Sequence, residues 1–238
     1  MRAWPPCLLT FLIAVSDRPV TLEVIASEIR SAEAGRADEP VSEATLEAEF
    51  RRTREALRAS PEFKTDDAET HFRLGEALHH QGDLTGAAEE FRAAIKLNPE
   101  FAEAHRSLGV VLMDRHDWAG AVEALRAAVR LRERDGEAVY WLGRALMAQG
   151  DWASAADALR TATRLKLDDA EAYADLGLVY MVQGNPTDAV EALRLAVQLK
   201  PDNADAHHLL ETLLGAQHDP EQVAQAARRI LDTLFARE

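Results

Sequence analysis

Residues 170–203 read AEAYADLGLVYMVQGNPTDAVEALRLAVQLKPDN, and this stretch decides the fold. Two sets of residues in it keep the spacing of a stripe along one face of a helix: Tyr173, Leu176, Gly177 and Tyr180, and then Ala189, Leu193, Ala196 and Val197. The glycine-containing polar segment between the two stripes predicts a turn. The stretch is therefore predicted to fold as two amphipathic helices that pack on each other.

The same pattern recurs along the chain with a period of 34 residues. One leucine column, one glycine column and two alanine columns keep this period. Their members are Leu74, Leu108, Leu142, Leu176 and Leu210; Gly75, Gly109, Gly143 and Gly177; Ala87, Ala121, Ala155 and Ala189; and Ala94, Ala128, Ala162 and Ala196. Small residues at fixed positions let two helix backbones approach closely, so the chain is predicted to stack similar helix pairs.

Each predicted turn carries an aspartate or asparagine just before the second helix. These dipeptides are Gly82-Asp83, His116-Asp117, Gly150-Asp151, Gly184-Asn185 and His218-Asp219. An Asp or Asn side chain at that position accepts a hydrogen bond from a free amide group of the first helical turn. Pro186 and Pro220 follow directly, at the first helical position, where a missing N–H costs nothing.

With Leu-Gly, Tyr, Ala and Pro positions in a 34-residue helix-turn-helix, the chain resembles the tetratricopeptide repeat family. The resemblance implies an all-α fold, a right-handed superhelical solenoid whose first helices line the concave side. Four well-matched repeats are expected at 68–101, 102–135, 136–169 and 170–203. Residues 204–238 are expected to be a degenerate fifth repeat, with Glu211 in the glycine column, that acts as the C-terminal cap.

The segment before the repeats gives weaker signals. Residues 1–40 are predicted to be a leader and linker, in which the apolar run 7–15 is either a weak export signal or a short core helix. Residues 41–67 are predicted to hold an N-terminal capping helix and a loop. The chain is expected to be cytoplasmic, or exported if residues 1–16 are a signal peptide.

Composition narrows the classes of partner. The 238-residue chain carries 27 Lys and Arg against 41 Asp and Glu, a net charge of −14. This charge repels phosphate backbones and anionic lipid headgroups, so nucleic acid is not an expected partner. The single cysteine, Cys7, excludes an intramolecular disulfide and a cysteine-based zinc site. No run approaches the ~20 apolar residues that a membrane-spanning helix needs.

The resemblance implies a ligand groove on the face of each first helix that does not pack inside its own repeat. The expected partner-binding residues on that face are Phe72, Arg73, Arg106, Val110, Met113, Tyr140, Trp141, Arg144, Met147, Leu178 and Met181. Three methionines recur at one repeat position and form a ladder that either contacts a partner or fills gaps between repeats. Trp141 either anchors a partner or packs against its own second helix.

Charged and polar groups on the same face indicate what the groove does not bind. Arg73, Arg106 and Arg144 are candidate anchors for an acidic side chain. The resemblance does not extend to the family's clamp of Lys, Arg and Asn for a terminal carboxylate, since this stripe has no Asn. A receptor for a chaperone tail is therefore not expected.

Motifs for catalysis and metal binding are missing from the sequence. His79-His80 and His207-His208 are adjacent pairs, and neighbours on a helix point about 100° apart, so neither pair holds one metal ion. The chain has no phosphate-binding glycine loop, no His-Glu-x-x-His and no Gly-x-Ser-x-Gly motif. We therefore expect no catalytic, cofactor or metal site, and no enzyme.

The sequence thus favours a non-catalytic scaffold that binds a peptide or helix of another protein in the concave groove, mainly by apolar contacts. One alternative is a structural module that forms homo-oligomers through its C-terminal helix, where Leu231 and Phe235 are expected to stay exposed. Another is an exported factor that assembles the cell envelope. The identity of the partner is not encoded in the repeat pattern.

Overall fold

The computed structural model describes residues 48, 51, 52, 55, 67–165, 169–215 and 220–235. The chain divides into two compact units, Met1–Ser60 and Pro61–Glu238, and the repeats lie in the second. The expected leader at 1–40 lies outside the described residues, as does most of the expected capping segment at 41–67. The turn at His218-Asp219 also lies outside them.

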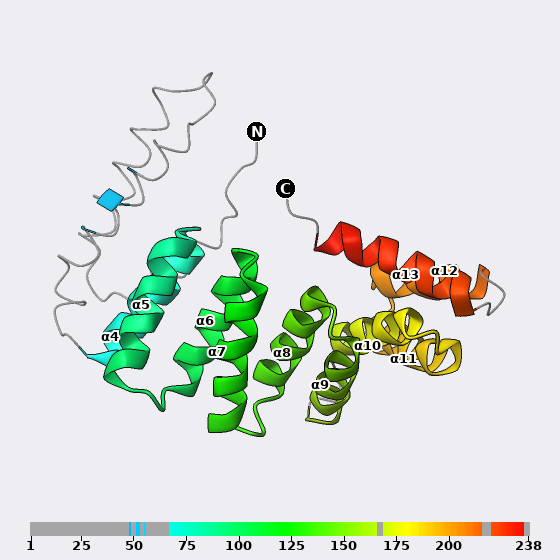
Figure 1. Cartoon of the computed structure of the whole chain (residues 1–238), viewed down its shortest axis with the longest axis horizontal. Helices are drawn as coiled ribbons and strands as arrows, with labels where there is room; N and C mark the ends of the chain where they lie inside the picture. The colour runs from blue at the N-terminus through cyan, green and yellow to red at the C-terminus, as the bar shows by residue number, and fades with distance from the viewer. Residues whose placement is uncertain are drawn as a thin grey trace, which may run out of the picture. The chain divides into compact units, whose positions relative to one another are not determined.

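The second unit is built from helices, and no strand occurs in the described parts of the chain. The helices are α4 (Ala68–His80), α5 (Leu84–Leu97), α6 (Ala102–Asp114), α7 (Trp118–Leu131), α8 (Gly136–Gln149), α9 (Trp152–Leu165), α10 (Ala170–Val182), α11 (Pro186–Leu199), α12 (Ala204–Gly215) and α13 (Pro220–Leu234). Consecutive helices from α4 to α11 pack in pairs, one pair in each expected repeat (Figure 1). The predicted all-α solenoid of tetratricopeptide repeats is confirmed.

The second helix of each pair begins at the predicted cap. Oδ1 of Asp83 accepts a hydrogen bond from the backbone N–H of Gly86 at 2.8 Å, and Asp117 caps α7 in the same way. Asn185 caps α11, whose first turn contains the proline. These bonds satisfy amide groups that would otherwise lack an intrahelical partner, so they fix where each second helix starts.

The turn before these caps passes through the left-handed backbone region. The φ angles are 84° at Gly82, 80° at Gly150 and 70° at Gly184. The second repeat has His116 at the same place with φ 58°, a conformation that a residue with a Cβ rarely adopts. The His116 ring lies edge-on to Trp118, with 5.1 Å between the ring centroids.

The glycine column lies where the two helices of a pair approach most closely. A Cβ atom placed on Gly75 would lie 2.7 Å from Cε1 of Phe91, which follows 16 positions later. On Gly109, Gly143 and Gly177 it would lie 2.5, 2.8 and 2.6 Å from Cγ of Leu125, Leu159 and Leu193. All four glycines are buried. The same contact is therefore made in every repeat, which confirms the predicted close approach.

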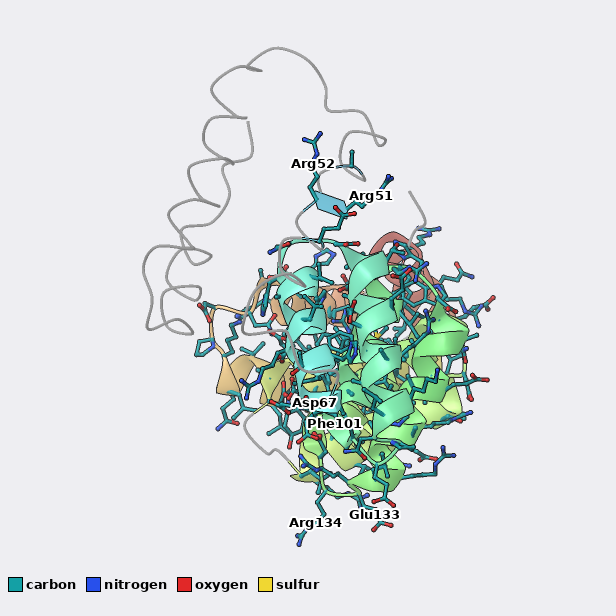
Figure 2. The ribbon with its side chains drawn as sticks, turned by 90° about the vertical axis from the view of Figure 1, so that its left-hand side faces the viewer. Arg51, Arg52, Asp67, Phe101, Glu133 and Arg134 are labelled. Carbon is teal, nitrogen blue, oxygen red and sulfur yellow. The ribbon has the colours of Figure 1, made fainter. Side chains whose placement is uncertain are left out.

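The stack curves towards its first helices. The first helices of adjacent repeats, such as α6 and α8, approach each other more closely than the second helices do. Turns between repeats lie together at one edge, where Figure 2 labels Asp67 and Phe101 just before α4 and α6. The exposed face of the first helices is therefore the concave face of this unit.

The fifth repeat departs from this arrangement. Helix α13 packs mainly against α10 and makes fewer contacts with α12, so α12 and α13 do not form a closed pair. Leu231 on α13 is only 4% exposed, and Phe235 is half-buried with its ring centroid 5.7 Å from that of Trp118. The expectation that these two residues stay exposed is therefore wrong for Leu231, whereas Phe235 remains partly exposed.

The glycine contact makes a stability prediction. In Gly143→Ala the new methyl group meets the Leu159 side chain, so that side chain or one of the two helices must shift. Such overpacking costs about 1–3 kcal/mol, which exceeds the roughly 1 kcal/mol that alanine gains over glycine in a helix. We expect urea unfolding to show a free energy of unfolding lower than that of the wild type by up to about 2 kcal/mol.

Gly215→Ala is the matched control, since no described atom lies within 4 Å of a Cβ at that position. It should leave the free energy of unfolding unchanged or raise it slightly. An equal loss of stability in both variants would contradict the packing explanation.

Candidate functional site

The concave face carries a short row of partly exposed apolar side chains. Phe72 on α4, Val110 on α6 and Trp141 on α8 each keep part of their surface accessible. Behind Phe72, ring centroids of Phe91 and Phe101 lie 5.7 and 4.9 Å away, so the ring is held in place by its own repeat and the next turn. These three residues were predicted to bind a partner, and they are accessible for it.

Trp141 is held by neighbours on its own helix. Its ring centroid lies 5.4 Å from that of Tyr140, and Cζ of Arg144 lies 5.6 Å from the Trp141 centroid. The second distance is within the range of a cation–π contact. Because Tyr140 is buried, it supports the indole rather than meeting solvent.

The methionine ladder is inside the structure. Met113, Met147 and Met181 are all less than a tenth exposed, and Leu178 is buried as well. The expectation that these four side chains lie open in the groove is wrong for this structure. The alternative prediction, that the methionines fill gaps between repeats, agrees with their burial.

The direction of the ladder follows from the cluster beside it. Ala174 lies seven residues before Met181 on the same face of α10, and it packs with Ala196 and Ala206. Ala206 belongs to the following first helix, α12. The methionine position therefore points towards the next repeat rather than into the groove.

The three arginines of the predicted site all have acidic partners within the chain. Nε of Arg73 donates to Glu69 at 2.8 Å, one turn earlier on α4. Arg106 on α6 pairs with Glu137 on α8. Nε of Arg144 lies 3.4 Å from Oδ2 of Asp175 on α10. These guanidinium groups therefore connect parts of the scaffold, and an acidic ligand would have to compete with those contacts.

Similar polar contacts join the neighbouring first helices from α4 to α10. Between α4 and α6, Nε2 of His79 lies 2.8 Å from Oδ2 of Asp114. The arginine pairs join α6 to α8 and α8 to α10. Such contacts fix the register of adjacent repeats on the concave side, although pairs with exposed partners contribute little to stability.

Asp175 is the most perturbed acid on the concave side. Burial raises its pKa to about 6, while the Arg144 charge and a hydrogen bond from the Tyr140 hydroxyl lower it. Burial also raises the pKa of Tyr140, and the charge on Asp175 adds to this effect. Within the described structure, Arg144 Nε and Asp175 Oδ2 have no partner with hydrogen-bond geometry.

The histidines have structural contacts. Nε2 of His105 lies 3.0 Å from the carbonyl oxygen of Pro99, and that of His207 lies 2.9 Å from the carbonyl oxygen of Pro201. Both bonds tie the start of a first helix to the preceding turn. Among the described residues, no three His, Cys, Asp or Glu side chains are grouped so as to hold a metal ion.

At its C-terminal end the groove is covered, which the repeat pattern did not predict. Leu178 and Val182 lie at the groove positions of α10 but are 1% and 5% exposed. Val110 and Asp114 occupy the same positions in α6 and remain accessible. The difference coincides with α13, which packs on α10. The sequence signals for it are Glu211, which breaks the glycine column, and Ala227, which stands where the other repeats have Phe or Leu.

Fold and groove define the class of this protein. A stack of 34-residue helix pairs with partly exposed apolar side chains on its concave face is a tetratricopeptide repeat protein, a general protein-binding scaffold. The chain belongs to the family described as the cilia and flagella-associated protein 70 C-terminal domain, whose model matches residues 22–235. No curated protein matches the sequence.

Solved structures of tetratricopeptide repeat proteins share the fold. A crystal structure of MamA is similar at 28% identity and a TM-score of 0.60, covering 68% of this chain and 86% of that one. YrrB, described as a TPR protein with an unusual peptide-binding site, is similar at 24% identity and a TM-score of 0.59, covering 69% and 84%. The APC/C hetero-tetramer Cut9–Hcn1 contains a chain at 22% identity and a TM-score of 0.60, covering 71% and 34%.

The raised pKa of Asp175 predicts a pH-dependent stability. Its native pKa of about 6 lies above the unfolded value of about 3.9, so the native state binds more protons between these two values. The contribution of Asp175 to stability therefore falls as the pH rises through this window. Between pH 4 and pH 7, the free energy of unfolding of the wild type should fall by about 1–3 kcal/mol more than that of Asp175→Asn.

Urea unfolding across that pH range measures the difference between the two proteins. Tyr140→Phe provides a second check, because it removes a hydrogen bond that favours the charged carboxylate. It should move the pH window of the Asp175 contribution upward. Parallel pH profiles for wild type and Asp175→Asn would contradict the assignment.

Proposed function

We propose that this protein is a non-catalytic scaffold that binds a peptide or helix of another protein on the concave face of α4, α6 and α8. The observation that carries the proposal is the row of Phe72, Val110 and Trp141. These apolar side chains are partly exposed on three successive first helices, and the two aromatic rings are each held by neighbouring rings. Pre-positioned side chains lose little conformational freedom on binding.

The charges of this face indicate the chemistry of the partner. Its arginines are paired within the chain. Glu76 exposes its carboxylate on α4, and the Asp114 carboxylate on α6 stays 48% exposed beside His79. The whole chain is also acidic, with a net charge of −14. A partner segment with apolar anchors and basic flanking residues fits this surface best, because complementary charge favours encounter and excludes acidic competitors.

The relatives support the class of activity. YrrB is described as having a peptide-binding site, and the structure that contains Cut9 is a complex with Hcn1. Both share the helix-pair stack with this chain. The proposal adds a location on the stack, the row on α4, α6 and α8, and a mainly apolar mode of contact.

Selection from a random peptide library displayed on phage tests this proposal with a defined probe. Peptides selected on the wild-type chain should carry aromatic or aliphatic residues together with Lys or Arg. Val110→Glu places a carboxylate in the middle of the row, so it should weaken binding of the selected peptides at least ten-fold, about 1.4 kcal/mol. Fluorescence anisotropy with labelled peptides measures the change.

Leu131→Glu is the matched control, since Leu131 is an exposed leucine at the end of a second helix. It adds the same charge away from the row and should leave the affinity unchanged. Circular dichroism checks that both variants keep their helices. Selected peptides that bind Val110→Glu as well as the wild type would show that the binding site lies elsewhere.

A further inference from the structure

Helix α13 has two sharply different faces. Val223, Ala227 and Leu231, spaced by four residues, are between 0% and 4% exposed. Gln225 and Arg229 are exposed on the opposite side. Residues four apart lie one above the other on a helix, so the buried set forms one narrow apolar stripe.

The stripe of α13 packs on α10, at the end of the concave face. Helix α13 packs on α10 more extensively than on α12. Figure 1 shows α13 running beside α10 towards the middle of the stack. Leu178 and Val182 are buried there, although the equivalent positions on α6 are accessible. At the far end of the helix, Phe235 contacts Trp118 of the second repeat. The helix therefore occupies the C-terminal part of the groove.

The sequence of the fifth repeat explains why α13 is not paired with α12. Glu211 replaces the glycine that lets a second helix approach, and close pairing would bury its carboxylate. Ala227 stands where the other repeats place the large residue that packs on this glycine. The helix pair of the fifth repeat thus lacks both the glycine and the large residue whose contact holds the helices together in the other four repeats.

Helix α12 retains an uncovered apolar position as a result. Leu214 is 48% exposed, whereas Leu78, Leu112 and Leu146 at the same repeat position are nearly fully buried. In the first three repeats this position is covered within the helix pair, and in the fourth Tyr180 stands there and is partly buried. The apolar stripe of α13 can therefore pack on the surface around Leu214 of α12 instead. This alternative lowers the free-energy cost of releasing α13 from α10.

We propose that α13 is a built-in occupant of the groove, and that the concave face of α10 binds amphipathic helices that carry a small-aliphatic stripe with four-residue spacing. A partner helix of this kind competes with α13, so α13 controls access to the C-terminal part of the groove. This inference rests on the proposed function of the concave face. It adds a second binding surface, the secondary structure of its ligand and a competitor within the chain.

The competition has a measurable consequence. When only a fraction of molecules has α13 released, the apparent Kd of an external helix is its intrinsic Kd divided by that fraction. A substitution that releases α13 therefore strengthens external binding without touching the α10 surface. Ala227→Glu is such a substitution, because it places a carboxylate in the buried stripe.

The probe is a fluorescent peptide with the sequence of residues 219–238, titrated against the 238-residue chain. We expect its Kd for the Ala227→Glu protein to be at least ten-fold lower than its Kd for the wild type. Gln225→Glu adds the same charge on the exposed face of α13 and should behave like the wild type. A peptide that itself carries Ala227→Glu should not bind. Equal affinity for wild type and Ala227→Glu would overturn the proposal.

Hydrogen exchange gives a second measurement on the wild-type protein. Saturating peptide should reduce the protection of amides in 220–235 at least ten-fold and leave α10 protected. Unchanged protection of 220–235 at saturation would overturn the proposal, whatever the folding of the variants. So would failure of the peptide to bind an Ala227→Glu protein whose α4–α11 amides stay protected.

The two proposals fail separately. Binding of library peptides depends on Val110, whereas binding of the 219–238 peptide depends on Leu178. Leu178→Glu in the Ala227→Glu background should abolish binding of the 219–238 peptide and spare that of the library peptides. Binding of the 219–238 peptide that survives Leu178→Glu would overturn the α10 site, while continued dependence of the library peptides on Val110 would leave the proposed function intact.

Discussion

The structure depends on one steric constraint, the missing Cβ at the glycine of each first helix. At Gly109, any Cβ would lie 2.5 Å from the Leu125 side chain, and the three other repeats make the equivalent contact. This contact sets the spacing within each pair, so every pair has nearly the same shape. Identical pairs stack with a constant rotation, which places the first helices on the inside of the curve. The concave face is a consequence of that packing.

The same constraint explains the end of the stack. Where Glu211 replaces glycine, the fifth pair stays open, α12 keeps Leu214 exposed, and α13 packs on α10 instead. Glu211 in this column, together with Ala227 on α13, therefore leaves α13 unpaired with α12 and free to cover the groove. The groove and its occupant have a common origin, since both follow from whether a second helix is able to approach its first helix closely.

The charged residues on the concave side mainly pair with each other between neighbouring first helices. Arg106 and Arg144 each reach an acid on the following first helix, so their charge is largely neutralised where a ligand would meet them. Asp175 is desolvated by the same packing, which raises its pKa. The accessible surface that remains is apolar, with carboxylates around it. The groove is therefore suited to recognise shape and apolar surface more than a specific negative charge.

The sequence by itself determined the helix pairs, the glycine contact and the caps, because these depend on residues within one repeat and recur with its period. Asp83, Asn185 and Gly75 do in the structure what their positions predicted. Only the tertiary structure decided which groove residues are accessible. Met147 and Leu178 lie on faces that a helical wheel leaves open, yet they are buried. Their covers come from elements outside their own repeat, and a local period carries no information about which distant helix packs over a face.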